Sequence, residues 1–295
     1  MISRGFGPWP TQNNELEVKK WLISRISQGV EEDERASVVN LCLDYLTNKT
    51  KGERIANDYR YTEALIDKLA LYADQINSNI PVQYVLGITQ FNNLEIIVED
   101  GVLIPRPETE ELVAAINSEI GTGFNGSIVD IGTGSGCIAL SLKDLNPQSH
   151  VVGLDISSDA IKIAKRNGQN LGLGVEFILL DIFEDQIDEV FDVVVSNPPY
   201  IHRTERESLE KRVKDFEPDI ALFVDEDPLL FYRRILFLCR NGLLNSGGLL
   251  ALECHKDYTS EIADLLDSDS WFNKSQIITD LQGEQRHVIA RTKVN

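Results

Sequence analysis

The sequence has few cysteines, no long apolar run and little positive charge. Its four cysteines include no Cys-x-x-Cys pair, which argues against a zinc knuckle or a redox motif and predicts buried thiols and no metal site. No window holds the roughly 18 uninterrupted apolar residues that a membrane-spanning helix needs. The N-terminal residues lack the basic and apolar segments of a secretory signal. We therefore expect a soluble, cytoplasmic protein that does not bind a membrane.

The charge is strongly negative and unevenly distributed. The 295 residues include 28 Lys and Arg against 47 Asp and Glu, a formal net charge of −19, and residues 81–295 carry −17 of it. A protein that binds nucleic acid normally neutralises phosphates with clustered Lys and Arg. We therefore expect no stable nucleic-acid binding by this region.

Two sequence patterns divide the chain. From about Leu16 to Asn77, apolar residues recur at three- and four-residue steps, which predicts several short helices. The stretch from Pro81 to Arg106, including Val82–Gly87 and Val102–Ile104, has β character and predicts a hairpin. From Thr109 onward, strand and helix patterns alternate. We therefore predict a helical bundle over residues 1–80, a linker with a β-hairpin over 81–108, and an α/β domain over 109–295.

The α/β region predicts a mainly parallel sheet with helices on both faces. A short turn precedes the last apolar run, so it should form an antiparallel hairpin at the edge of the sheet. The expected strands are Ile128–Ile131, Val151–Leu154, Val175–Leu180, Phe191–Val195, Leu249–Leu252, Gln276–Ile278 and His287–Ala290.

A glycine-rich turn follows the first of these strands. It reads Gly132-Thr133-Gly134-Ser135-Gly136, and a helical pattern comes after it. Glycines let the backbone pass close to a ligand, and the start of a helix offers free N–H groups. The alternative is a turn that only closes a strand–helix corner. The Gly-x-Gly-x-Gly spacing differs from the dinucleotide pattern and makes a pyrophosphate ligand less favoured.

An acidic residue ends the next strand. Asp155 lies 19 residues after Gly136, where its carboxylate could accept hydrogen bonds from both hydroxyls of a ribose. The alternative is a helix N-cap, for which Ser157 is an equally good candidate. Together, the turn and the acid favour a nucleoside ligand.

The strand Phe191–Val195 leads into Ser196-Asn197-Pro198-Pro199-Tyr200. The prolines fix φ and remove N–H donors, so the Asn197 side-chain oxygen and the Pro198 carbonyl become rigid acceptors. Two such acceptors suit a planar NH₂ group, and Tyr200 could offer it an aromatic face. The alternative is a proline-rich turn without a ligand.

These motifs resemble the class I S-adenosylmethionine-dependent methyltransferases that alkylate nitrogen on planar groups, whose fold is Rossmann-like. A closer resemblance is to the release factor glutamine methyltransferases and spans roughly residues 81–291. It rests on Pro81–Gly87, on Leu103–Glu110 and on Phe216-Glu217-Pro218.

The resemblance implies S-adenosylmethionine as cofactor and a peptide chain release factor as protein substrate, and we expect a monomer. Gly132 to Gly136 would pass beneath the methionine part of the cofactor, Asp155 would hold the ribose, and Asp181 and Ile182 would border the adenine. Asn197 would also touch the cofactor. With Pro198, Pro199 and Tyr200 it would bind the substrate amide, and the catalytic residues would be Asn197, Pro198 and Tyr200.

The sequence departs from the family's pattern at two positions. Many relatives have an aromatic residue where Ile182 stands, so aliphatic packing helped by Phe183 could replace stacking on the adenine. The segment Leu252-Glu253-Cys254-His255 also differs, and we interpret it as a strand end without a role in the chemistry.

Two other functions stay open. One is an N6-adenine or other nucleic-acid amino-methyltransferase, which the negative charge disfavours. The other is a non-catalytic nucleoside-binding adaptor, which would not need the paired acceptors of Asn197 and Pro198. The implied role of residues 1–80 is recognition of the protein substrate.

Overall fold

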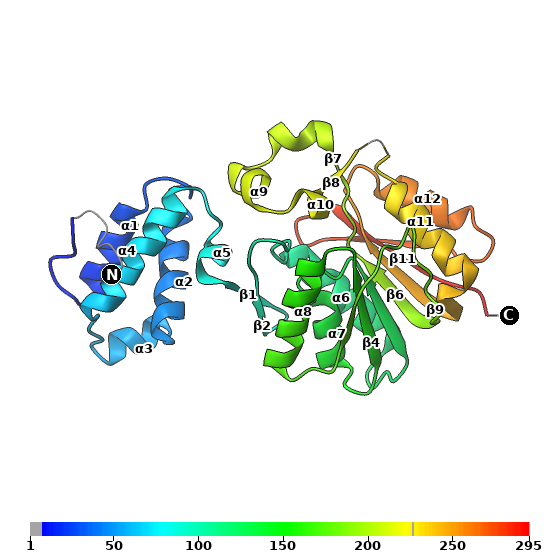
Figure 1. Ribbon diagram of the computed structural model, residues 1–295, viewed down its shortest axis with the longest axis horizontal. Helices are drawn as coiled ribbons and strands as arrows, with labels where there is room; N and C mark the ends of the chain where they lie inside the picture. The colour runs from blue at the N-terminus through cyan, green and yellow to red at the C-terminus, as the bar shows by residue number, and fades with distance from the viewer. Residues whose placement is uncertain (1–7, 226, 295) are drawn as a thin grey trace. The chain divides into compact units, whose positions relative to one another are not determined.

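The computed structural model describes residues 8–225 and 227–294, and the chain divides into two compact units (Figure 1). The first unit is Met1–Gly87 with Glu210–Phe216, and the second is Ile88–Leu209 with Glu217–Asn295. In the first unit, the described helices are α1 (Glu15–Arg25), α2 (Arg35–Thr47), α3 (Lys51–Ala56), α4 (Glu63–Asn77), α5 (Val82–Leu86) and α9 (Lys211–Phe216).

The helical pattern predicted between Leu16 and Asn77 is confirmed by α1 to α4. Side-chain caps define where α1 and α4 begin: the Asn14 side chain accepts from Glu17 N, and Thr62 Oγ1 accepts from Leu65 N. Such caps satisfy N–H groups that lack a partner within the helix.

The β character expected for Val82–Gly87 is wrong, because this stretch forms helix α5. Pro81 has φ −52° at the start of the helix, and its carbonyl accepts from Val85 N at 3.1 Å. Gly87 ends the helix in the left-handed region with φ +79°. The proline before and the glycine after the run outweigh the β preference of its valines and tyrosine.

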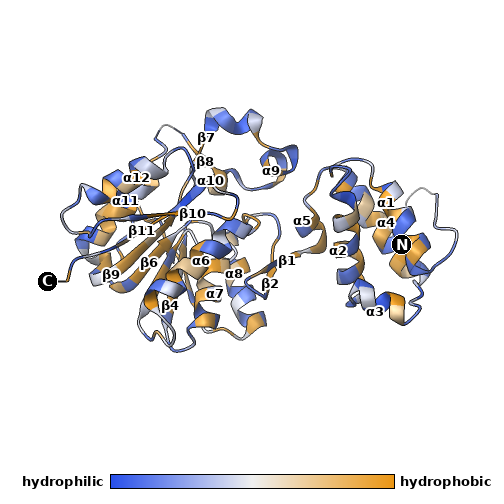
Figure 2. Cartoon of the chain, turned by 180° about the vertical axis from the view of Figure 1, so that it is seen from behind, coloured by the Kyte–Doolittle hydropathy of each residue, from blue (hydrophilic) through white to orange (hydrophobic). Residues whose placement is uncertain are grey.

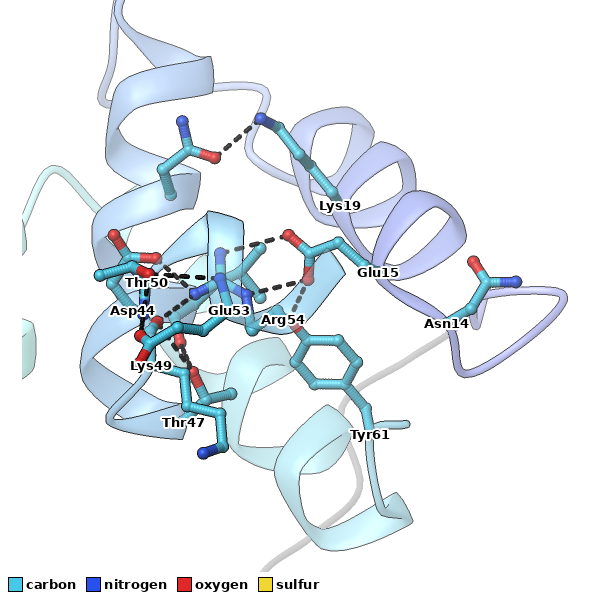
Figure 3. A network of polar contacts seen from close by, with 12 residues as sticks. Asn14, Glu15, Lys19, Asp44, Thr47, Lys49, Thr50, Glu53, Arg54 and Tyr61 are labelled. Carbon is cyan, nitrogen blue, oxygen red and sulfur yellow. Dashed lines mark hydrogen bonds and ion pairs between the residues drawn. The ribbon is translucent and has the colours of Figure 1, made fainter. Parts of the chain in front are cut away.

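A buried arginine holds helices α1, α2 and α3 together (Figure 3). The Arg54 side chain is fully buried, and its Nε and Nη2 donate to the two carboxylate oxygens of Glu15 at 2.9 and 3.2 Å. Nη1 donates to Asp44 and to the Lys49 carbonyl. Tyr61 donates its hydroxyl to Glu15 at 2.5 Å. Every part of the guanidinium therefore has an acceptor, as a buried charge requires.

In the second unit, the described strands are β1 (Ile88–Phe91), β2 (Leu94–Ile97), β3 (Ser127–Ile131), β4 (His150–Asp155), β5 (Glu176–Leu179), β6 (Phe191–Ser196), β7 (Ile201–His202), β8 (Phe223–Val224), β9 (Leu244–Glu253), β10 (Gln276–Thr279) and β11 (Gln285–Arg291). Its described helices are α6 (Pro107–Ile120), α7 (Cys137–Leu145), α8 (Ser158–Leu171), η1 (Arg203–Ser208), α10 (Asp219–Leu222), α11 (Leu230–Leu238), η2 (Cys239–Leu243) and α12 (Thr259–Asp267).

The central sheet has the strand order β10-β11-β9-β6-β3-β4-β5. Strands β9, β6, β3, β4 and β5 run parallel, whereas β11 is antiparallel to both of its neighbours. This confirms the predicted mainly parallel α/β sheet with an antiparallel C-terminal hairpin. Strand β11 lies one place inside the sheet, and β10 forms the edge itself.

Helices cover both faces of this sheet (Figure 1). Alternate strand residues such as Val129 and Leu250 pack with Ile235 of α11 and Ile262 of α12 in one buried cluster. Helices α7 and α8 contact the sheet through β3, β4 and β5. Figure 2 shows the inner strands as largely hydrophobic, as expected for a parallel sheet that is buried on both sides.

A hairpin of β1 and β2 lies between Pro81 and Arg106. Its turn residues Asn92 and Asn93 both have positive φ, of 47° and 64°, which is the conformation of a tight two-residue hairpin turn. The β character expected for Val102–Ile104 is wrong. Ile104 N donates to the Glu217 carboxylate at 3.3 Å instead of to a neighbouring strand.

Within the described ranges, no helix combines the length and the apolar character that crossing a membrane would require.

Candidate active site

A cavity of about 240 Å³ opens where the parallel strands β3, β4 and β6 end. Ligands of open α/β sheets bind at this edge. Of the residues singled out from the sequence, those that line the cavity are Gly132, Gly134, Asp155, Asp181, Ile182, Asn197, Pro198 and Pro199. Those that do not line it are Thr133, Ser135, Gly136 and Tyr200.

The glycine turn contributes bare backbone to the cavity wall. Gly132 and Gly134 have φ +74° and +55°, and a Cβ added at either would meet no atom within 4 Å. The space beside this backbone is therefore open to a ligand. Gly136 serves packing instead, because it begins α7 with φ +83° and a Cβ there would come within 3.0 Å of the Phe177 ring.

Asp155 joins the glycine turn to the next strand. One carboxylate oxygen accepts from Gly134 N at 2.8 Å, and the other accepts from Ser157 N at 2.8 Å. Ser157, and not Asp155, is the N-cap of α8, because its hydroxyl accepts from Ala160 N. Burial raises the pKa of Asp155, while the two N–H bonds lower it. Each oxygen keeps a lone pair that could accept from a ligand hydroxyl.

Thr133 and Ser135 point into the protein. Thr133 Oγ1 donates to Asp130 at 2.6 Å, and both residues are buried. Burial raises the pKa of Asp130 to about 7. The Ser135 hydroxyl is buried without a hydrogen-bond partner. No role was assigned to Asp130 from the sequence, although a carboxylate within an apolar strand indicates a buried, paired acidic group.

Asp181, Ile182 and Phe183 form another part of the wall. Asp181 Oδ1 accepts from Phe183 N at 2.9 Å, and this bond closes a local turn. Ile182 is 8% exposed, whereas Phe183 is 37% exposed and meets the Phe231 ring edge-on. The wall therefore offers an aliphatic side chain and an adjacent aromatic ring for a flat apolar group.

The segment after β6 begins at the cavity and leads away from it. Ser196 Oγ donates to the Ile131 carbonyl at 2.7 Å and ties this segment to β3. Asn197 lines the cavity and donates through Nδ2 to Thr109 Oγ1 at 3.3 Å. Tyr200 lies beside His255, with ring centroids 5.8 Å apart. Burial raises the pKa of its hydroxyl above the usual range.

Glu253 is the polar group of this region that sequence reasoning set aside. It ends β9, as expected, but its side chain is 1% exposed and accepts from Thr109 Oγ1 at 2.7 Å. Burial raises its pKa to about 7, against the lowering effect of the Thr109 bond. A carboxylate that directly follows the apolar run Leu249–Leu252 was the available signal.

Two segments that carried the family resemblance meet beside the cavity. Arg106 Nη2 donates to Glu217 at 2.5 Å, and the other oxygen of this buried carboxylate accepts from Ile104 N. The loop before α6 is thereby fixed, and its residues Val102 and Leu103 line the cavity.

The chain is similar to known methyltransferases. A family model described as methyltransferase small domain matches residues 108–214. The chain is 42% identical to the release factor glutamine methyltransferase of Bacteroides thetaiotaomicron, over 73% of this chain and 77% of that protein. It is 33% identical to the one of Bacillus anthracis, over 93% and 98%.

The crystal structure of a methyltransferase from Pyrococcus furiosus has a similar fold. Its TM-score is 0.51 with 19% identity, and the match covers 68% of this chain and 90% of that one. This likeness concerns the fold alone, and together with the strand order it confirms the predicted Rossmann-like methyltransferase architecture.

Proposed function

The chain belongs to the release factor glutamine methyltransferase family, and from this premise we propose that it methylates a glutamine side-chain amide in a peptide chain release factor. The methyl donor is S-adenosylmethionine. The observation that carries the proposal is the position of Asn197, on the wall of the same cavity as the glycine turn and Asp155.

The residues of the cavity fit this cofactor. The open backbone at Gly132 and Gly134 suits a chain that passes close by, and the Asp155 carboxylate has free lone pairs for two hydroxyls. Ile182 and Phe183 offer an apolar surface for a flat base. When bound, the cofactor supplies a methyl group on a positively charged sulfur that is already activated by its leaving group.

The chemistry required of the protein is mainly orientation. An amide nitrogen is a poor nucleophile because its lone pair is delocalised into the carbonyl. Asn197 Oδ1 and the Pro198 carbonyl would each accept one amide hydrogen, which increases electron density on nitrogen and fixes its direction. Correct positioning can supply about 7–11 kcal/mol of the barrier. The methylated nitrogen is acidic and would lose its proton to one of these acceptors or to water, so no strong base is needed.

The first test is Asn197→Ala with labelled S-adenosylmethionine and three acceptors: release factor, DNA and ribosomal RNA. We expect wild-type transfer to release factor only, and a loss of about 10²-fold in kcat for the variant, typical of a missing preorganised hydrogen bond. Cofactor affinity should change little. Wild-type turnover by the variant would remove Asn197 from the mechanism, and transfer to nucleic acid instead of protein would refute the proposed function.

We also propose that residues 1–80 recognise the release factor. The first unit contains a groove of about 620 Å³ that is lined by apolar side chains and by charged side chains of both signs, including Leu16, Lys19 and Ile55. Leu16 and Ile55 are 61% and 58% exposed. Exposed apolar side chains around a groove are typical of a protein-binding surface. A release-factor substrate would place the enzyme in the cytoplasm, where translation occurs.

Leu16→Asp tests this role of the groove. We expect KM for release factor to rise at least fivefold, while methylation of a short glutamine peptide stays unchanged. Leu281→Asp makes the same change at a leucine that is 93% exposed in the second unit, and it is the matched control. Equal KM values for the two variants would show that the groove does not bind the substrate.

A further inference from the structure

We propose that Glu253 and Thr109 are positioning residues that determine which side of the Asn197 amide faces the substrate. The inference rests on the proposed function, in which Asn197 Oδ1 accepts a hydrogen from the substrate amide. An asparagine amide is nearly symmetric in shape, so a cavity alone does not distinguish its oxygen from its NH₂ group. A fixed acceptor on the NH₂ side is needed to do so.

Three elements bring this acceptor into place. Thr109 lies in the first turn of α6, Glu253 ends β9, and Asn197 directly follows β6. Strands β6 and β9 are parallel neighbours in which Ser196 is paired with Leu252. The next residue of each strand is therefore brought to the same edge of the sheet, beneath the start of α6.

The direction of the hydrogen bonds follows from the donors available. An ionised carboxylate only accepts, so the single hydroxyl hydrogen of Thr109 goes to Glu253, at 2.7 Å. Thr109 Oγ1 can then only accept, and it does so from Asn197 Nδ2 at 3.3 Å. Because the amide is planar, Nδ2 toward Thr109 leaves Oδ1 on the opposite side. The chain of bonds therefore specifies the acceptor that the reaction needs.

A protonated Glu253 would remove this specification. It could donate to Thr109, and Thr109 could then donate to Asn197 Oδ1, which turns the NH₂ group toward the substrate. Burial raises the pKa of Glu253 to about 7, so the change falls within the range of an enzyme assay.

Several other ionisable groups surround this carboxylate. Arg286 lowers its pKa, Glu108 of α6 raises it, and a direct hydrogen bond from the Asn197 side chain also lowers it. His287 is paired with Glu253 across β9 and β11, and burial lowers its pKa to about 4. The remaining ionisable neighbours are thiols and phenols whose pKa burial raises above the assay range: Cys137, Tyr200, Tyr232 and Cys254. Among these neighbours, Glu253 is the group expected to titrate near pH 7.

The decisive pair of variants is Thr109→Val and Thr109→Ser. Valine keeps the shape and removes the hydroxyl, so we expect kcat to fall at least tenfold while affinity for S-adenosylmethionine stays within twofold. Serine keeps the hydroxyl and should restore most of the activity. Cofactor affinity and circular dichroism show that each variant is folded. A Thr109→Val enzyme with wild-type kcat would overturn the inference.

A pH profile separates positioning from a merely structural role. We expect wild-type kcat to fall below about pH 7, as Glu253 takes up a proton. Glu253→Gln cannot titrate and can both donate and accept, so its kcat should be several-fold lower and should show no change near pH 7. The same decline in this variant as in wild type would assign it to another group and refute the role of Glu253.

These outcomes distinguish the two proposals. If Asn197→Ala is inactive and Thr109→Val is fully active, the positioning inference fails and the proposed function stands. If Asn197→Ala keeps wild-type turnover on release factor, Asn197 has no part in the mechanism and the positioning inference fails, while the proposed function stands. If the wild-type protein does not methylate release factor, the proposed function itself fails.

Discussion

The charge on Glu253 should destabilise the protein, and Glu253→Gln measures by how much. The side chain is 1% exposed, and burial raises its pKa from a usual value of 4.5 to about 7. A carboxyl whose pKa is raised on folding binds more protons in the folded state between these two values. Stability therefore decreases as pH rises through this window.

The size of the effect follows from linkage. A shift of the Glu253 pKa from 4.5 to about 7 lowers the free energy of unfolding by roughly 3 kcal/mol above pH 7. Roughly 2–3 kcal/mol of this loss develops between pH 5 and pH 8. Glutamine does not titrate. The free energy of unfolding of the variant, relative to that of wild type, should therefore rise by this amount between pH 5 and pH 8. The altered hydrogen bonds of the variant add a difference that does not change with pH.

Urea unfolding at several pH values provides the assay. The chain has three tryptophans, and Trp271 alone among them lies in the second unit. A Trp9→Phe, Trp21→Phe background therefore reports on the unit that contains Glu253. Asp130 also has a pKa near 7, but it is present in both proteins and cancels in the difference. A difference that stays constant from pH 5 to pH 8 would refute an ionisable, buried Glu253.

Three further predictions test other parts of the structure. Asp155→Ala should weaken S-adenosylmethionine binding at least tenfold by calorimetry, because two hydroxyl acceptors are lost; an unchanged Kd would contradict the ribose assignment. Arg54→Met should reduce the free energy of unfolding of the first unit by about 3 kcal/mol, because it leaves the Glu15 carboxylate without its cation; a loss below 1 kcal/mol in a Trp21 fluorescence titration would contradict this. Gly136→Ala should lower the stability in thermal unfolding by about 2 kcal/mol or more, because the new methyl group crowds the Phe177 ring and the residue keeps a left-handed φ. Gly172→Ala is the control: its φ is +67° but its surroundings are open, so it should lose only about 1 kcal/mol. Equal losses would show that the contact with the ring has no effect.

Much of the fold follows from local sequence signals. The run Leu249–Leu252 is apolar throughout, which is the pattern expected of a strand buried on both faces, and it is found as part of strand β9. Val82–Leu86 and Val102–Ile104 are also mainly apolar, but one lies between a helix-starting proline and a left-handed glycine. The other donates a backbone hydrogen bond to Glu217, more than a hundred residues away. The β preference of the residues alone predicts neither the helix at Val82–Leu86 nor the loop at Val102–Ile104.

The residues proposed from the sequence to bind ligand share one property: each lies in a short segment that carries its own signal. Gly132 and Gly134 come directly after a strand, Asp155 ends the next one, and Asn197 precedes two prolines. The only local signal for Glu253 is its place directly after the apolar run Leu249–Leu252, which predicts a strand end but no partner for the carboxylate. Its significance depends on β9 lying beside β6, and no feature of either segment specifies that pairing, since about fifty residues separate them.

The order of the strands also separates two roles along one edge of the sheet. Across β4, β3, β6 and β9, the polar groups at the strand ends are Asp155, the glycine turn, Asn197 and Glu253. The first three reach the cavity wall, whereas Glu253 is not among the described residues that line it. It can therefore influence a bound amide only through Asn197, which it reaches through Thr109 and through a side-chain hydrogen bond of its own. A carboxylate that is destabilising when ionised, and that has no access to ligand, is best explained by the direction it gives to those two hydrogen bonds.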